Sequence, residues 1–368
     1  MNKAITHLFR IIVGVLFIFS GLIKANDPSG LSYKMQEFFE VWNLTAFNDA
    51  TLVFSILMIA FEIIAGVAVL MGWQFKLFSW MLFGLIIFFT FLTGYAVVSG
   101  AIRECGCFGD CIKLTAEQSF LKDLILFGMI GFLLAKRNAV QPIFNNYISA
   151  SVLSVSTIIS FLLQIHVLQH QPYVDCLPYK IGNDIQEGMK APLGSIPDST
   201  VIKFVYLKEG KEVEFDAEHF PQDFNDSAYI FVKRYDKLIR EGNAKPPIKD
   251  FVINTADGLD TTQAILNDPR EMMVLFVKEM KDYHEWVDDF KAITTVMQQS
   301  GRPIIVITSD FDRVKKVLND KKIDVPVLKG DAVAIKTAAR STPTLYRIQQ
   351  GVILNKWGRL DLKDAINK

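Results

Sequence analysis

The amino-acid sequence predicts a membrane-embedded α-helical bundle followed by a water-soluble α/β domain. Of its 368 residues, 51% are apolar, and 19 of the 78 charged side chains precede Pro172, although that part is nearly half of the chain. This asymmetry indicates two solvents, lipid for the first half and water for the second. The 39 basic and 39 acidic residues balance, which argues against a nucleic-acid partner because such binding requires a basic surface.

Five apolar runs in the first half predict membrane-spanning helices, since a hydrocarbon core of about 30 Å requires about 20 residues. The runs are 5–23, 52–71, 75–98, 120–135 and 147–168. The fourth run is short and carries Lys122 and Asp123 in its first turn. We therefore expect it to need a tilted neighbour or a locally thinner bilayer.

Basic residues at the ends of the spans predict their orientation, because Lys and Arg in short loops stay on the cytoplasmic side. Lys3, Lys76 and Lys136 mark alternate ends, which places the N-terminus inside and everything after the fifth span outside. The first run could instead be a cleavable signal peptide, but no small-x-small cleavage site follows it. We expect a multi-pass protein of a bacterial inner membrane, in contact with the lipid bilayer, with a periplasmic C-terminal domain.

Apolar residues recur at helical spacing over 31–42, between the first two spans, which predicts an amphipathic helix. This helix either lies along the outer membrane interface or caps the bundle as a packed loop helix. In both cases it covers the end of the bundle where the cysteines are expected.

The second half begins with a linker, because prolines interrupt any regular element between Pro172 and Pro197. A β-hairpin and one further strand are then predicted, at 201–207 with 212–215 and at 229–235. After Pro247 strands and helices alternate, which predicts a mixed sheet with helices on both faces. The predicted strands are 250–254, 272–277, 303–308, 325–328, 345–348 and 352–357, and the predicted helices are 284–299, 313–321 and 332–340.

Three of the four cysteines stand within seven residues, at Cys105, Cys107 and Cys111, and the fourth is Cys176. The predicted orientation brings all four to the oxidising outer face. A disulfide between Cys105 and Cys107 would close a very small ring, so we expect it to be strained and easily reduced. A thiol–disulfide relay is the sharpest hypothesis, with Cys105 and Cys107 exchanging and the other two cysteines resolving.

Two other interpretations of the cysteines stay open. Relaxed disulfides, such as one between Cys111 and Cys176, could simply tie the loop to the linker. A four-thiolate zinc site fits less well. Paired zinc ligands usually have two to four residues between them, whereas Cys-x-Cys has one. Four cysteines allow three pairings, so the sequence alone leaves the connectivity open.

Glu62 lies near the middle of the second span. A carboxyl group at that depth is costly unless it is protonated, paired or facing a cavity. It is therefore a candidate for moving a proton beside a bound redox ligand. The alternative is a neutral glutamic acid that is hydrogen-bonded to a neighbouring helix.

Several of these features resemble the DoxX-like membrane proteins, and most closely their methylamine-utilisation (MauE-like) branch. The resemblance rests on the segment SGLIKANDP at 20–28, on Glu62 with Gly66, and on CGCFG at 105–109. It covers roughly residues 5–135 and implies a four-helix membrane bundle. MauE is implicated in making the disulfide-rich subunit of a dehydrogenase, so the resemblance implies disulfide chemistry here, though not methylamine as a substrate.

The C-terminal part is similar to the thioredoxin fold of membrane-tethered thiol reductases. Thr342-Pro343-Thr344 stands where that family places its cis-proline, and 272–277 corresponds to its central strand. The family's Cys-x-x-Cys is missing, because residues 279–284 read EMKDYH and no cysteine follows Cys176. This part therefore cannot exchange disulfides itself, and we expect it to hold a partner beside the membrane thiols.

The whole arrangement is similar to DoxX-like proteins of the Bacteroidetes that carry an exported thioredoxin-like tail. We expect a DoxX/MauE-like four-helix membrane domain at 1–139 and a fifth transmembrane helix at 140–171. A linker with a small β-rich region follows at 172–245, and a thioredoxin-like domain lacking Cys-x-x-Cys at 246–368.

The predicted function is electron transfer between thiols of an exported partner protein and a membrane acceptor. The sequence establishes no cofactor, and a membrane quinone is the candidate acceptor. The catalytic candidates are Cys105, Cys107, Cys111, Cys176 and Glu62. The rival hypothesis is a non-enzymatic assembly protein with structural disulfides. A transporter ranks last, because the spans offer a single central charge.

Overall fold

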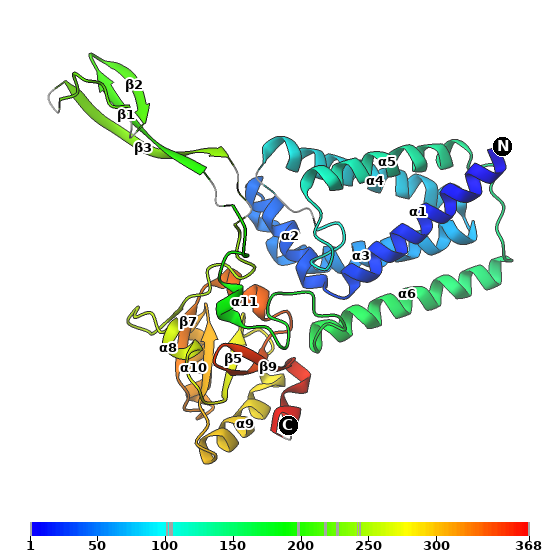
Figure 1. Cartoon of the computed structure of the whole chain (residues 1–368). Coiled ribbons are helices and arrows are strands. Elements are labelled where there is room, and N and C mark those ends of the chain that lie inside the picture. Colours follow the sequence, from blue (N-terminus) through cyan, green and yellow to red (C-terminus); the bar gives the residue numbers. More distant parts are fainter. Residues whose placement is uncertain are drawn as a thin grey trace.

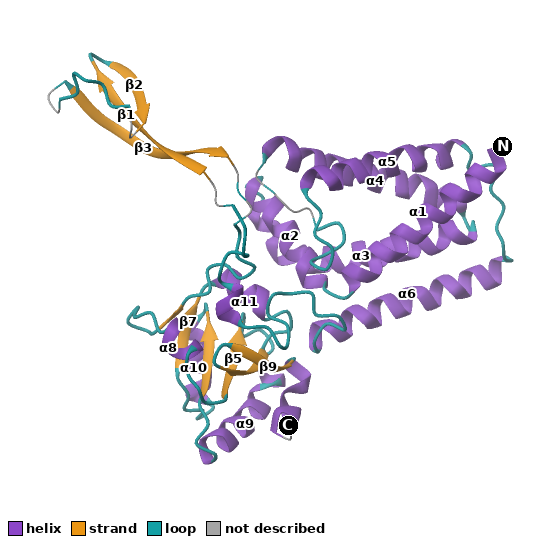
Figure 2. Cartoon of the chain, in the orientation of Figure 1, coloured by secondary structure: helices purple, strands orange, loops and turns teal. Residues whose placement is uncertain are grey.

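A computed structural model of the chain describes residues 2–100, 102, 106–196, 199–216, 219–225, 228–240, 242 and 244–366. Figure 1 shows three parts: a bundle of long helices, a projecting three-stranded sheet and an α/β domain that carries the C-terminus. Colouring by secondary structure separates the all-helical bundle from the two parts with strands (Figure 2).

Five helices in the described part of the chain are long and apolar enough to cross a membrane. They are α1 (Asn2–Ala25), α3 (Thr51–Met71), α4 (Phe75–Ser99), α5 (Ala116–Ala135) and α6 (Asn146–Gln169). Large apolar side chains such as Leu8, Phe91 and Leu162 are more than half exposed on their outer faces, as expected for surfaces that meet lipid. The predicted membrane bundle, a four-helix core with a fifth span, is thus confirmed.

The helix α5 corrects one prediction, because it begins at Ala116 rather than at residue 120. Thr115 forms a capping box with Gln118, in which each side chain bonds the other's backbone N–H at 3.3 and 3.1 Å. Such a cap satisfies amides that would otherwise lack partners at the helix start. The helix gains a full turn and reaches 20 residues, the length that a hydrocarbon core of about 30 Å requires.

Glycines allow α1 and α3 to approach closely. A Cβ atom at Gly66 would lie 2.8 Å from the carbonyl oxygen of Gly14, and one at Gly21 would lie 2.5 Å from Ile63 Cγ1. Small residues at such positions are what permits helix backbones to pack closely in a membrane. This contact sets the register that brings the polar residues of α1 beside α3.

The two ends of the bundle are distinct. At the end with the N-terminus, the α5–α6 loop meets the α3–α4 turn, where Ile143 N donates to Met71 O at 2.9 Å. The other end carries α2 (Pro28–Val41), η1 (Thr45–Ala50), the cysteine loop and the start of the linker. There Asn26 Nδ2 donates to the carbonyl of Val174 at 2.8 Å. The prediction of a helix over 31–42 is confirmed by α2.

The projecting sheet has the order β2-β1-β3, with all strands antiparallel. Its strands are β1 (Ser199–Lys208), β2 (Lys211–Asp216) and β3 (Tyr229–Arg240). An aromatic cluster around Tyr206 and Phe215 covers one part of it, with ring centroids 5.3 Å apart. The predicted hairpin is confirmed, and β3 extends the predicted third strand by five residues.

The α/β domain contains a six-stranded mixed sheet of order β4-β7-β6-β5-β8-β9. Its central strands β5, β6 and β7 are parallel, whereas β8 and β9 form an antiparallel hairpin at one edge. The strands are β4 (Ile253–Asn254), β5 (Met272–Val277), β6 (Ile304–Thr308), β7 (Val327–Gly330), β8 (Thr344–Gln349) and β9 (Val352–Trp357). β4 is shorter than predicted, because Asp250 has a φ of 53°, a left-handed conformation that no strand accommodates.

Separate apolar cores cover the two faces of this sheet, one around Tyr346 and Phe276 and one around Trp286 and Phe290. The α-helices of the domain and of the linker before it are α7 (Ile185–Gly188), α8 (Thr262–Leu266), α9 (Val287–Gln299), α10 (Phe311–Asp320) and α11 (Ala332–Ala338). The 3₁₀ helices are η2 (Tyr283–Glu285) and η3 (Arg359–Ile366). The predicted α/β character is confirmed, and the Thr342–Pro343 peptide bond is cis, directly before β8.

Candidate functional site

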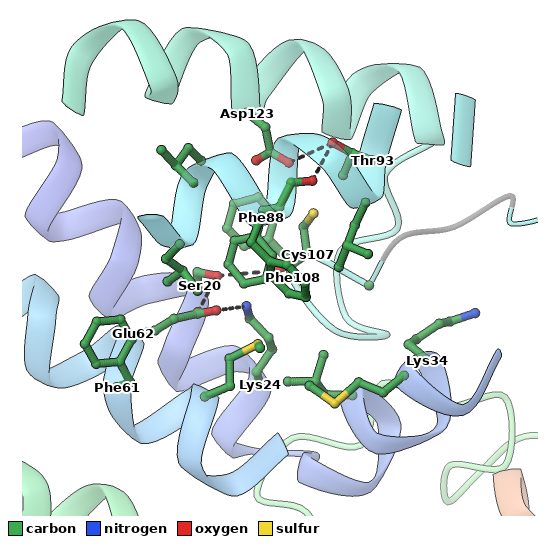
Figure 3. A pocket seen from close by; sticks show the side chains of 18 of the residues that line it. Ser20, Lys24, Lys34, Phe61, Glu62, Phe88, Thr93, Cys107, Phe108 and Asp123 are labelled. Carbon is green, nitrogen blue, oxygen red and sulfur yellow. Dashed lines mark hydrogen bonds and ion pairs between the residues drawn. The ribbon is translucent and has the colours of Figure 1, made fainter. Parts of the chain in front are cut away.

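A cavity of about 470 Å³ lies inside the bundle at the end that carries the cysteine loop. Side chains of α1, α2, α3, α4, α5 and the loop 106–108 line it, and most are apolar or aromatic. Ordinary ligand sites have volumes of this size, with a few polar groups in a mainly apolar wall. Figure 3 shows Phe61, Phe88 and Phe108 around this space together with the polar side chains described next.

Glu62 has a charged partner that the sequence did not identify. Its carboxylate is 1% exposed and forms an ion pair with Lys24 Nζ at 2.5 Å. The Ser20 hydroxyl lies 3.1 Å from Glu62 Oε2 and 3.0 Å from the carbonyl oxygen of Cys107, and can donate to one of them at a time. Ser20 and Lys24 are four residues apart on α1, so both face Glu62 on α3.

A second ion pair, between a partly exposed lysine and a buried carboxylate, lies on the other side of the cavity. Lys122 Nζ is 2.6 Å from Asp123 Oδ1, and the Asp123 carboxylate is fully buried. Thr93 on α4 donates to Asp123 Oδ2 at 3.1 Å. We had expected these charges in the first turn of a short helix, but the earlier start of α5 places them within the wall. The expectation of a single central charge in the spans is therefore wrong.

The cysteine loop turns tightly between α4 and α5. Gly106 and Gly109 have φ values of 66° and 58°, a left-handed conformation that glycine adopts without strain. Gly109 N donates to Gly106 O at 3.0 Å, and Phe108 forms a bridge with Ile112. This loop holds Cys107 against the cavity.

The structure describes three of the four cysteines and joins two of them. Cys111 and Cys176 form a disulfide, with their Cα atoms 4.9 Å apart. Cys107 is a free thiol that lines the cavity, whereas Cys105 lies outside the described residues. Of the three pairings that the sequence allows, this one engages the two cysteines to which we had assigned a resolving role. With both sulfurs in a bridge, a four-thiolate zinc site does not form.

Lys122 connects the thiol with the charged residues. It lines the cavity together with Cys107 and Glu62, and its ammonium group lies 5.5 Å from the centroid of the Phe108 ring. A cation in this position can hold the negative charge that a sulfur carries during thiol–disulfide exchange. The cavity thus combines a thiol, three lysines (Lys24, Lys34 and Lys122) and two carboxylates in a mainly apolar enclosure.

The α/β domain docks on the same end of the bundle through Arg340. This side chain is 8% exposed and bonds Asp27 Oδ2 at 2.8 Å and Asp110 Oδ2 at 2.6 Å. The cation also lies 5.1 Å from the ring centroid of Tyr33 on α2. Burial raises the pKa of Asp27 above its ordinary value, although Arg340 opposes this shift. Burial lowers the pKa of Arg340, but the two carboxylates outweigh it and the net pKa is raised.

The end of strand β5 also faces the membrane helices. Lys278, the first residue after β5, donates from Nζ to the Tyr33 hydroxyl at 3.1 Å. This is the edge where the thioredoxin resemblance would place a Cys-x-x-Cys, and no cysteine stands there. The domain therefore presents Lys278 toward α2 and Arg340 toward the cysteine loop.

Two family models match parts of this chain. Residues 2–136 match the family described as methylamine utilisation protein MauE. Residues 200–241, which include most of the projecting sheet, match a domain of unknown function, DUF8463.

Protein TlpB from Flavobacterium psychrophilum is 29% identical to this chain over 176 residues. That match covers 44% of this chain and 45% of TlpB, so the similarity extends over less than half of either protein. No solved structure matches the chain. The residues that line the cavity thus all lie within the segment that is similar to the MauE family.

Proposed function

We propose that this protein is a membrane thiol–disulfide oxidoreductase whose reactive thiols are Cys105 and Cys107. In this proposal the pair accepts electrons from the thiols of an exported partner and passes them to an acceptor within the membrane. Cys111 and Cys176 hold the loop in place rather than relaying electrons. The protein would sit in a bacterial inner membrane with its cysteine end and C-terminal domain in the periplasm.

One observation carries the proposal: the free thiol of Cys107 lines a cavity that also holds two ion pairs with buried carboxylates. A thiol in purely structural surroundings would need no such charges. Buried ion pairs are a weak source of stability, because desolvation offsets most of their attraction. Their presence beside a thiol is better explained by charge and proton movement during exchange.

The α/β domain has a supporting role in this proposal. It resembles the thioredoxin fold but lacks cysteines, and its cis-Pro343 loop lies next to Arg340, which contacts Asp110 of the cysteine loop. We infer that it guides an extended segment of the partner toward Cys107. The domain then contributes binding, and the membrane thiols contribute the chemistry.

A second candidate function is a non-enzymatic assembly factor. The Cys111–Cys176 disulfide favours it, because this bridge joins the loop to the linker as a structural disulfide would. In that case Cys107 would play no part in function, and the α/β domain alone would bind the partner.

Thiol trapping separates these functions. Cells are quenched with a mass-tagged maleimide, with and without mild reductant, and the tags per chain are counted. Maleimide tags reduced thiols only. If Cys105 and Cys107 cycle, they should change between the tagged and the untagged state when the partner is supplied, whereas Cys111 and Cys176 should stay untagged in their disulfide. A Cys105→Ser and Cys107→Ser double variant should leave the exported partner reduced. If that variant oxidises its partner normally, the oxidoreductase proposal is wrong and the assembly function stands.

A further inference from the structure

We infer that the cavity binds the head group of a lipid-soluble quinone, which serves as the electron acceptor. This inference rests on the proposed function for the source of the electrons, and on the cavity alone for the binding. Three arguments support it: the entry of a ligand from the bilayer, the positions of hydrogen-bond donors in the cavity, and the balance of electrons and protons in the reaction.

The cavity opens toward the surface that meets lipid. Phe54 and Leu57 of α3 and Phe88 of α4 line it, and they are also 43%, 53% and 43% exposed on the outside of the bundle. A residue that borders both the cavity and the outer surface marks an opening between them. A ligand can therefore enter sideways from the bilayer, which favours a molecule with a long apolar tail.

The interior is too polar for a lipid tail alone. Glu62 and Asp123 are 1% and 0% exposed, and each is paired with a lysine. An acyl chain offers these groups no hydrogen bond, so burying them beside one would be costly. A quinone has two carbonyl oxygens at opposite edges of its ring, and the ammonium groups of Lys24 and Lys122 are suitable donors to them.

Aromatic rings accompany both donors. Lys24 Nζ lies 5.4 Å from the centroid of Phe89, and Lys122 Nζ lies 5.5 Å from the centroid of Phe108. In Figure 3 the Lys24–Glu62 pair and Asp123 lie on opposite sides of Phe88, Cys107 and Phe108. A planar ring held between these sides would stack on phenylalanine faces and receive a hydrogen bond at each edge.

The reaction balances with the groups present. Oxidation of the thiol of Cys107 and of its partner thiol forms one S–S bond and releases two electrons and two protons. Reduction of a quinone to a hydroquinone takes up two electrons and two protons, one proton on each carbonyl oxygen. Glu62 and Asp123 can accept the thiol protons and return them through Lys24 and Lys122, so no further reactant is required.

Binding can be tested without turnover. The full chain carrying Cys105→Ser and Cys107→Ser is reconstituted in nanodiscs and titrated with decylubiquinone, and Trp42, which lines the cavity, reports binding by fluorescence quenching. We expect saturable quenching that disappears with Trp42→Phe. The neutral pair replacement Lys24→Met with Glu62→Gln should weaken binding about 10- to 100-fold, the loss expected for a charge-assisted hydrogen bond.

A size test supports the location independently of charge. Leu85→Phe would narrow the cavity and should abolish the saturable quenching of Trp42, whereas Leu8→Phe, on the lipid-facing side of α1, should leave the affinity unchanged. Retention of the Cys111–Cys176 disulfide in each variant, read from its mass, checks that the fold is intact.

Three results would overturn the quinone site: quenching that does not saturate, equal displacement by oleate, or unchanged affinity in both cavity variants. Equal displacement by oleate would identify an acyl-chain site instead. The binding test uses the Cys105→Ser, Cys107→Ser protein, which has no reactive thiols. If that protein does not bind quinone, the proposed oxidoreductase function is not contradicted, but it requires another electron acceptor. Conversely, tight quinone binding with thiols that never cycle would overturn the proposed function and not the site.

Discussion

Replacing Arg340 with methionine should release the α/β domain from the bundle. The guanidinium group holds Asp27 and Asp110 together at 2.8 and 2.6 Å, and all three side chains are at most 25% exposed. Without it, two like charges face each other in a partly buried interface, and breaking such a pair costs about 3–5 kcal/mol. The docked population should therefore fall at least about 100-fold relative to the undocked one.

Amide hydrogen exchange measures this change on the full chain in nanodiscs. Segments 26–34 and 106–114, which face the domain, should exchange faster in the Arg340→Met variant, while α3 and α5 stay protected. Lys336→Met is the matched control, because Lys336 makes one hydrogen bond at 3.2 Å to Gln36 and a cation–π contact with Tyr33. Loss of these two contacts should weaken the free energy of docking by about 1 kcal/mol or less. Equal exchange in the two variants would refute the assignment of Arg340 as the centre of docking.

Three further predictions concern stability and pH. Replacing Cys111 and Cys176 with serine should lower the free energy of unfolding by about 4 kcal/mol, because their disulfide closes a loop of 65 residues; an unchanged thermal midpoint would contradict this. Glu62→Ala should destabilise the bundle by about 3–5 kcal/mol, since it leaves the 4%-exposed Lys24 unpaired, whereas Glu62→Gln with Lys24→Met should be nearly neutral in the same melting assay. The folded protein should gain stability as the pH falls through the raised pKa of Asp27, because the folded state then binds a proton more tightly than the unfolded one; Asp27→Asn should remove this pH dependence of the thermal midpoint.

The sequence predicts the helices well because their signals are local. The apolar runs differ from the observed spans by four residues or fewer at each end. The largest error, at the start of α5, falls on a readable signal: Thr115 followed three residues later by Gln118 is a capping box. Strand β5 matches its predicted range, since a wholly buried apolar run leaves little freedom in its bounds.

The candidate site depends on contacts between distant segments, and these are not encoded locally. Glu62 could be identified as costly at its depth, but its partner Lys24 follows from the register of α1 on α3, which the close contacts of Gly14 and Gly66 set. The burial of Asp123 depends in the same way on α4. Sequence spacing also left the pairing of Cys111 open, because its partner Cys176 is 65 residues away.

The Cys111–Cys176 disulfide has a consequence for how the α/β domain moves. The domain is attached to the bundle twice, by the chain leaving α6 and by this covalent link a few residues later. A tether so short keeps the effective concentration of the domain at its docking surface very high. Individually weak contacts such as Lys278 with Tyr33 can then hold it closed, and brief openings can admit a partner without loss of the domain. Reduction of this single bond would lengthen the tether and widen the volume that the domain explores.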